Sequence, residues 1–317
     1  MIWLFQNANY PFFRYKNIGY AVSIGLTLLA LGAIAVRGGL RYSIDFTGGT
    51  LVQVKFDEPV ETQALRDALA RVEGLSSSEV QRFGDPTDVL IRAQVPAGEE
   101  DVFGDRIESH LRQAPELEGR DFQVVRTEAV GPKIGEELKT QAVMAVLYAL
   151  VLILIYVAIR FDLKFGVAAI VATLHDVVMS VGIFALVDKE ISLAVVAAFL
   201  TIVGYSLNDT IVVFDRIRED LRAMRRESYA TVVNTAVNQT LSRTILTSGS
   251  TLIAVLFLYF VGGSVIHDFA FALIVGIVVG TYSSIFIAAP LVVDWHRRFE
   301  EGRVPAPGAR KTKAGAR

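Results

Sequence analysis

The chain has 317 residues, of which 52% are hydrophobic, and a formal net charge of −2 at pH 7. Its mean hydropathy of +0.45 and its clustered apolar runs exclude an ordinary soluble domain and indicate an integral membrane protein. The absence of cysteine excludes disulfides, zinc–thiolate sites, iron–sulfur clusters and a cysteine nucleophile. The four histidines form no i, i+4 pair, so neither a metal nor another cofactor is expected.

Six apolar runs of about 20 residues predict six helices, each long enough to cross a hydrocarbon core of roughly 30 Å. The runs lie at 18–36, 139–159, 165–187, 191–214, 243–262 and 266–294. The first run could be a signal peptide, because "AIA" at 33–35 resembles a cleavage site. Its length and the apolar runs that follow favour an uncleaved anchor.

The distribution of charge predicts the orientation in the membrane. Residues 41–138 hold 11 Lys and Arg against 20 Asp and Glu, a net −9, whereas the rest of the chain has a net +7. Basic segments lie at 160–164, at 216–228 and after the sixth run. Because cytoplasmic loops are enriched in Lys and Arg, we expect both termini in the cytoplasm and the acidic segment on the opposite side.

Four domains follow from these spans. They are the cytoplasmic N-terminus with the first span (1–37), an external α+β domain (38–138), the five remaining spans with a cytoplasmic connector at 216–241 (139–299), and a basic cytoplasmic tail (300–317).

The external segment shows a β-α-β-β-α-β pattern. "TLVQVKF" (50–56) alternates as a strand, and 60–72 has helical periodicity. "SEVQRF" and "DVLIRAQV" form a hairpin pattern around "GDPT", and a helix at 98–114 precedes a last strand at 121–130. This order predicts a small ferredoxin-like domain. It has no nucleophile elbow and no phosphate loop, so we expect a binding or structural module, not an enzyme, and no nucleic-acid partner.

The connector at 216–241 carries a second pattern. An apolar stripe is formed by Val232, Val233, Ala236, Val237 and Leu241. It is typical of an amphipathic helix lying in the membrane interface. A solvated connector helix is an equally good interpretation.

Asp209 is the first of two charged residues whose position in a predicted membrane span carries a free-energy cost. It lies late in the fourth span with Asn208 and Thr210 beside it, and Tyr205 and Ser206 lie one turn earlier on the same helical face.

Arg243 is the second such group, at the start of the fifth span, with Thr247 one turn later. Consecutive spans run antiparallel, so Asp209 and Arg243 are expected at similar depth. Burial disfavours a charged carboxylate and a neighbouring arginine favours it, and such a balance suits a group that loads and releases a proton. A static ion pair, or an Asp at the interface with no role, remains open.

His175 and Asp176 form another polar insertion, near the middle of the third span. A proton relay and a structural hydrogen bond to a neighbouring helix are both consistent with it. In the sixth span, "GIVVG" (276–280) has the G-x-x-x-G spacing of closely packed helices.

Glycine pairs mark both junctions of the external domain with the membrane. Gly48 and Gly49 permit a tight turn after the first span, where Asp45 could cap the turn, and Gly131 and Gly135 flank the entry to the second. We interpret these positions as joints, and as pivots for motion of the domain.

Several motifs in chain order resemble one family. They are "YSIDFTGGT" (42–50), "VGPKIGEEL" (130–138), "YSLNDTIVVFDRIRED" (205–220), "NQTLSRTILTS" (238–248) and "FALIVGIVVGTYSSIFIAAP" (271–290). Together they resemble the SecD/SecF family of bacterial protein-export membrane proteins, in particular its smaller, stand-alone SecF members.

The resemblance implies half of a bundle like that of the resistance-nodulation-division transporters, with SecD supplying six further spans. It implies association with SecD, with the SecYEG channel and with translocating preproteins in the bacterial inner membrane, and YajC or YidC as further candidate partners. It implies use of the proton motive force in late translocation, with Asp209 and Arg243 in proton conduction. Accessory polar roles are expected for Asn208, Thr210, Thr247, His175 and Asp176.

Two other functions remain open beside a proton-coupled export subunit. One is a scaffold that only stabilises the translocase, and the other is half of a proton-driven exporter of small molecules or lipids.

Overall fold

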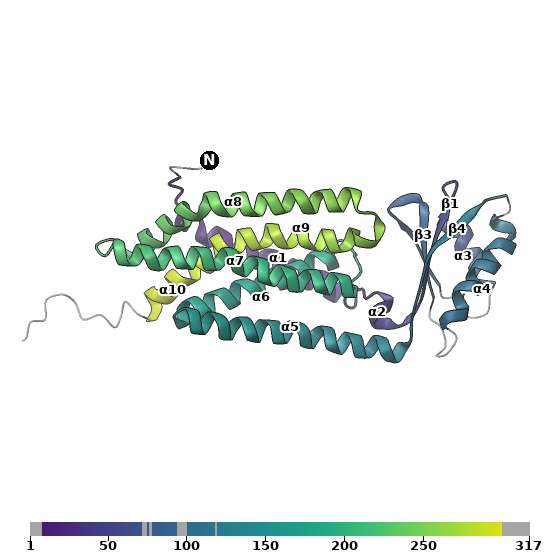
Figure 1. Cartoon of the computed structure of the whole chain (residues 1–317), viewed down its shortest axis with the longest axis horizontal. Coiled ribbons are helices and arrows are strands. Elements are labelled where there is room, and N and C mark those ends of the chain that lie inside the picture. The colour runs from purple at the N-terminus through teal and green to yellow at the C-terminus, as the bar shows by residue number, and fades with distance from the viewer. Residues whose placement is uncertain (1–7, 72–74, 76–77, 94–99, 118, 300–317) are drawn as a thin grey trace, which may run out of the picture.

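The computed structural model describes residues 8–71, 75, 78–93, 100–117 and 119–299. In this part of the chain, six helical segments are long and apolar enough to cross a membrane. They form a bundle with a small α+β domain at one end (Figure 1). The basic tail at 300–317 lies outside the described residues.

Five spans are single helices, and the first of them follows a short 3₁₀ turn (Phe12–Tyr15). They are α1 (Lys16–Val36), α5 (Pro132–Arg160), α6 (Leu163–Leu186), α7 (Leu193–Ala223) and α8 (Tyr229–Val261). The sixth consists of α9 (Ser264–Ser283), a π-helical turn (Ser284–Ala288) and α10 (Ala289–Phe299). Three of these helices begin at residues that favour a helix N-terminus. The Ser192 and Ser228 side chains cap α7 and α8, and Pro132 occupies the first turn of α5.

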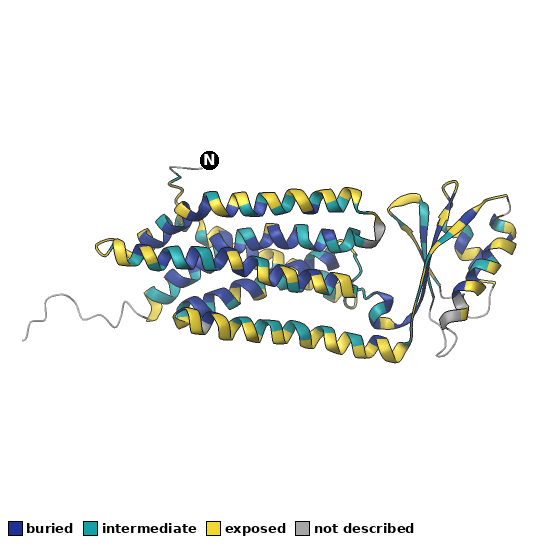
Figure 2. Ribbon diagram, in the orientation of Figure 1, coloured by how far each residue is buried: buried dark blue, intermediate teal, exposed yellow. Residues whose placement is uncertain are grey.

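Burial divides the bundle into central and peripheral helices. In Figure 2, α5 is exposed along most of its length, whereas α6, α7 and α9 carry most of the buried residues. Exposed residues of α5 are largely apolar, including Leu152 and Tyr156. An apolar exposed face of this kind suits contact with lipid.

Two glycines bring α7 and α9 into close contact. A Cβ atom on Gly276 would lie 2.1 Å from Ile202 Cγ1, and one on Gly280 would lie 3.0 Å from Ser206 Cβ. The tight packing expected from "GIVVG" is therefore confirmed.

The first span is an integral helix of the bundle. Gly182 of α6 faces Ala30 of α1 so closely that a Cβ atom would lie 2.2 Å from the Ala30 Cβ. Tyr282 of α9 donates a hydrogen bond to the Gly19 carbonyl (2.7 Å). These contacts pack the first span against α6 and α9.

The α+β domain has the expected order of elements. Its elements are β1 (Gly49–Phe56), α3 (Thr62–Leu69), β2 (Glu79–Phe83), β3 (Asp85–Ala93), α4 (Glu100–Gln113), a 3₁₀ turn (Pro115–Leu117) and β4 (Phe122–Val130). The sheet order is β2-β3-β1-β4, and all three pairings are antiparallel. Gly84, with φ of +74°, makes the β2–β3 hairpin tighter than expected, because β3 already begins at Asp85.

The connector interpretations are wrong. Residues 216–241 form the end of α7, a turn and the first turns of α8, not a separate helix. The apolar stripe from Val232 to Leu241 is buried in the main core of the bundle, so it contacts protein instead of the membrane interface or water. The sequence pattern predicts the apolar stripe itself, but the surface that covers the stripe is set by how α7, α8 and α10 pack.

Candidate functional site

Asp209 lies inside the bundle on α7, with only 4% of its surface exposed. Ser248 of α8 donates a hydrogen bond to Asp209 Oδ2 (3.2 Å). The Thr281 hydroxyl of α9 lies 2.8 Å from Ser248 Oγ, so it can donate to that oxygen in turn. A chain of two hydroxyls therefore joins the carboxyl group to two other helices.

The expected neighbours of Asp209 do not all face it. Thr210 is buried beside it, whereas Asn208 is exposed on another face of α7. Thr247 turns its hydroxyl back to its own helix, 2.9 Å from the Arg243 carbonyl. The nearest partner is thus Ser248, one residue further along α8.

Arg243 does not pair with Asp209. Although α7 and α8 are adjacent antiparallel helices, the Arg243 side chain is exposed. Within the described ranges its guanidinium makes no hydrogen bond and no ion pair. The structure brings the two residues onto neighbouring helices but turns the arginine outward.

Asp176 of α6 is the second buried carboxylate, with 0% exposure. Ser283 of α9 donates to its Oδ2 (2.7 Å), and Ser206 of α7 donates to the same oxygen. His175 Nδ1 lies 2.9 Å from Oδ1. Three side chains from three helices therefore hold this carboxylate.

The polar sequence at the end of α9 serves both carboxylates. Thr281 reaches toward Asp209 through Ser248, and Ser283 bonds Asp176. Between them Tyr282 faces α1, 3.1 Å from Ser23 Oγ. A π-helical turn follows at Ser284, a feature frequent at functional sites. Sequence reasoning did not assign Thr281 and Ser283 to the site, although "TYSS" directly after "GIVVG" was a signal.

The glycines at the domain junctions pack against one another. Gly48 has φ of +71°, and a Cβ atom there would lie 2.7 Å from Pro132 Cα. A Cβ atom on Gly135 would lie 2.9 Å from the Gly48 backbone nitrogen. Gly49 has φ of +119°, whereas Gly131 has ordinary extended geometry, with φ of −64°. The segment that enters the α+β domain after α2 (Ile44–Thr47) and the start of α5 therefore pack together at Gly48 and Gly135.

Asp45 does not cap the Gly48–Gly49 turn. It lies on the short helix α2 (Ile44–Thr47), and its Oδ2 accepts a hydrogen bond from the backbone N–H of Leu193 (2.8 Å). This bond ties the junction to the start of α7, the helix that carries Asp209.

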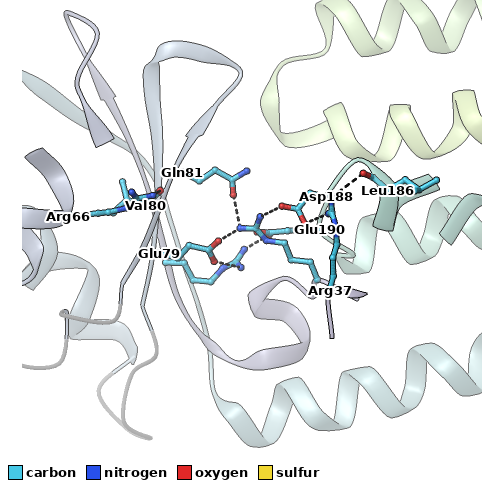
Figure 3. A network of polar contacts seen from close by, with 10 residues as sticks. Arg37, Arg66, Glu79, Val80, Gln81, Leu186, Asp188 and Glu190 are labelled. Carbon is cyan, nitrogen blue, oxygen red and sulfur yellow. Dashed lines mark hydrogen bonds and ion pairs between the residues drawn. The ribbon is translucent and has the colours of Figure 1, made fainter. Parts of the chain in front are cut away.

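A network of charges joins the α+β domain to the turn between α6 and α7 (Figure 3). Arg41 donates to Gln81 (2.9 Å) and to Asp188 (3.2 Å), and it also pairs with Glu79 and Glu190. Arg92 of β3 pairs with Glu190 as well. These contacts hold the β2 and β3 side of the sheet against the membrane bundle.

Comparison with known proteins places this architecture in one family. Residues 111–298 match the family "Protein export membrane protein SecD/SecF, C-terminal", and residues 32–60 match "SecD/SecF GG Motif". "Protein translocase subunit SecF" of Desulfurispirillum indicum is 48% identical over 92% of this chain and 93% of its own. "Protein translocase subunit SecDF" of Thermus thermophilus is 46% identical over 88% of this chain and 37% of its own.

Solved structures agree. The crystal structure of SecDF, "a translocon-associated membrane protein", from Thermus thermophilus has a TM-score of 0.84 at 42% identity over 94% of this chain. SecDF "in Super-membrane-facing form" has a TM-score of 0.69 over 95% of it. The chain spans 40% of the length of either solved chain. It therefore belongs to the SecD/SecF family of protein-export membrane proteins and is a SecF-type subunit within it.

Proposed function

We propose that this protein is the SecF subunit of a SecDF complex that uses the proton motive force to promote late steps of protein export through the SecYEG channel. The relatives named SecF and SecDF support the subunit assignment. The burial of Asp209 carries the proposal of proton coupling.

Asp209 has the features of a site that exchanges a proton. The residue is only 4% exposed, and among the described residues its carboxyl group has one hydroxyl donor, Ser248. A buried carboxylate with so little compensation is costly in its charged form, while a neutral carboxyl group is tolerated. Only modest changes around the group are then needed to shift it between the two forms.

Arg243 supplies the matching cation from outside the bundle. An exposed arginine in a membrane helix is costly unless it meets an anion or water. Its outward direction supports a partner carboxylate on SecD, as the resemblance implies. The single-chain SecDF relatives, in which this chain matches 37–40% of the length, support such an association.

One face of α7 suits that association. Its exposed positions Ala197, Thr201, Gly204 and Asn208 follow each other at spacings of three or four residues. Small and polar residues at this spacing permit close packing between membrane helices, whereas lipid-facing positions are usually larger and apolar. We assign this face to the spans of SecD.

The orientation belongs to the proposal as well. Lys16 near the start of α1 pairs with Asp294 near the end of α10, so both ends of the described chain lie at one end of the bundle (Figure 1). The C-terminal end of α7, which carries Arg216 and Arg222, lies at the same end of the bundle (Figure 1). By the positive-inside bias we place this end in the cytoplasm of a bacterial inner membrane and the α+β domain outside it.

Asp209→Asn tests the proton role, because it keeps the shape of the side chain and removes the titratable group. In vesicles that carry the complete translocase with SecD, we expect gradient-dependent export to fall to the level without SecDF, while the complex still assembles. Asp215→Asn is the matched control, since Asp215 lies on the same helix in an exposed pair with Arg160. Retained gradient-dependent export in the Asp209 variant would establish the scaffold function instead.

A further inference from the structure

A groove runs along the bundle between α1, α6 and the last span. It consists of two adjoining cavities of about 370 Å³ and 180 Å³, which share Val171 and Leu291 in their walls. The larger cavity is almost entirely apolar and reaches His175. The smaller one opens beside Lys164 and Arg298.

The groove has a regular construction. Its lining residues recur at helical spacing on three elements, with Tyr20, Ile24 and Thr27 on α1, Lys164, Val171 and His175 on α6, and Ile287, Leu291 and Arg298 along the last span. Each series runs from the end of the molecule where α1 begins toward the middle of the bundle. The groove is therefore parallel to the helices and to the lipid chains around them.

Its depth matches one leaflet of a bilayer. Lys164 and His175 lie eleven positions apart on α6, which corresponds to about 16 Å at a rise of roughly 1.5 Å per residue. Half of a hydrocarbon core of roughly 30 Å is about 15 Å. An acyl chain entering at Lys164 thus ends near His175.

The mouth of the groove carries an available basic residue, Arg298. Arg298 is exposed and makes no ion pair among the described residues. Lys164 is already engaged, with its ammonium 5.3 Å from the Tyr229 ring centroid and 5.7 Å from that of Phe165. Asp294, the acidic residue in the lining, is already engaged by Lys16 and by the Tyr20 hydroxyl (3.1 Å). Trp295 lies beside it, a side chain typical of the membrane–water interface.

We propose that this groove binds an anionic phospholipid, with one acyl chain in the apolar cavity and the phosphate beside Arg298 at its mouth. Basic pockets between membrane helices are suited to anionic head groups. A transmembrane helix, roughly 10 Å across, is too wide for the two cavities. The small-residue face of α7 that we assign to SecD takes no part in the groove lining, so the lipid site is independent of the proposed function.

Native mass spectrometry of the full chain with its SecD partner tests the head-group contact. Phosphatidylglycerol and phosphatidylcholine with the same acyl chains serve as the two probes. Each basic residue near an anionic membrane surface contributes about 1 kcal/mol, or about a fivefold change in affinity. We expect Arg298→Gln to weaken phosphatidylglycerol binding about fivefold and to leave phosphatidylcholine binding unchanged.

Arg226→Gln is the matched control for charge, because Arg226 is exposed in the turn between α7 and α8, outside the groove. It should bind both lipids as the unmodified protein does. Equal phosphatidylglycerol binding by the two variants would overturn the assignment of the head group.

A second pair of variants tests the acyl chain. Val171→Phe fills the groove where the two cavities meet, and Leu174→Phe places the same aromatic side chain at an exposed position of α6 that does not line it. We expect Val171→Phe alone to reduce binding of both lipids. Equal binding by these variants, or competition by free glycerol phosphate as effective as that by phosphatidylglycerol, would overturn the proposal of a lipid site.

Discussion

Asp176 and Asp209 are both buried carboxylates, but their surroundings differ. Asp176 accepts from Ser206 and Ser283 and contacts His175, whereas Asp209 accepts from Ser248 as its one donor in the part of the chain that the structure describes. A carboxylate with two hydroxyl donors and a histidine contact is stabilised in its charged form and fixes the groups around it. We therefore assign Asp176 to joining α6, α7 and α9, and Asp209 to proton exchange.

Asp176→Asn should destabilise the protein, because its amide nitrogen would face hydroxyl and imidazole donors. Hydrogen bonds to a charged group contribute about 1.5–3 kcal/mol each, so we expect the free energy of unfolding to fall by about 3 kcal/mol. Denaturant titration of the purified complex in detergent measures this. Asp209→Asn alters one hydroxyl hydrogen bond and Asp215→Asn one exposed ion pair, so each should change it by about 1 kcal/mol or less. If Asp176→Asn unfolded at the same denaturant concentration as those two variants, the joining role would be wrong.

At the scale of elements, the contact between α7 and α9 governs the position of the candidate site. Gly276 and Gly280 let α9 approach α7 closely enough for Ser283 to reach Asp176 and for Thr281 to reach Ser248. A side chain at either glycine would separate the helices and lengthen these hydrogen bonds. The close approach of α7 and α9 therefore produces both the tight packing at the glycines and the hydrogen bonds of Thr281 and Ser283.

Gly276→Ala should loosen this crossing. The added Cβ atom would lie 2.1 Å from Ile202 Cγ1, so the helices must move apart. Overpacking of this kind costs about 1–3 kcal/mol, which thermal unfolding of the purified complex should record as a lower Tm. Gly249→Ala is the control, because a Cβ atom at that helical position meets nothing within 4 Å. An unchanged Tm for Gly276→Ala would contradict the crossing as described.

For the whole molecule, the α+β domain is held to the bundle at two places. The glycine contact between Gly48 and Gly135 makes a compact junction, and the Arg41 network links the sheet to Asp188 and Glu190. The Arg41 side chain is only 24% exposed, and it bridges the sheet and the turn between α6 and α7 through several partners. We expect the Arg41 network to restrict the orientation of the α+β domain relative to the membrane bundle.

Arg41→Gln should therefore widen the range of domain orientations. Because the chain has no cysteine, spin labels can be introduced directly at Gln63→Cys and Phe260→Cys, two exposed positions on the domain and on α8. Pulsed electron paramagnetic resonance should show a broader distance distribution between them. Arg112→Gln, which removes an ion pair within α4, should leave the distribution unchanged. A distribution as narrow in Arg41→Gln as in the control would exclude the restraining role.

The sequence by itself determined the local features of the protein. Apolar runs of sufficient length required membrane helices, since no other open structure satisfies its backbone in lipid, and alternation with helical periodicity predicted the β-α-β-β-α-β order. The free-energy cost of placing a polar or charged side chain in a membrane identified Asp209, Arg243 and Asp176 as candidates, although their partners were not known. Each of these conclusions depends on residues close together in the chain.

Only the tertiary structure decided which groups meet. Arg243 and Ser248 lie five residues apart on α8, yet Ser248 faces Asp209 and Arg243 faces outward. The rotation of a helix about its own axis is set by packing against its neighbours, and the stripe at 232–241 was misinterpreted for the same reason. The lipid groove is likewise formed by α1, α6 and α10, segments more than a hundred residues apart, so no local pattern predicted it.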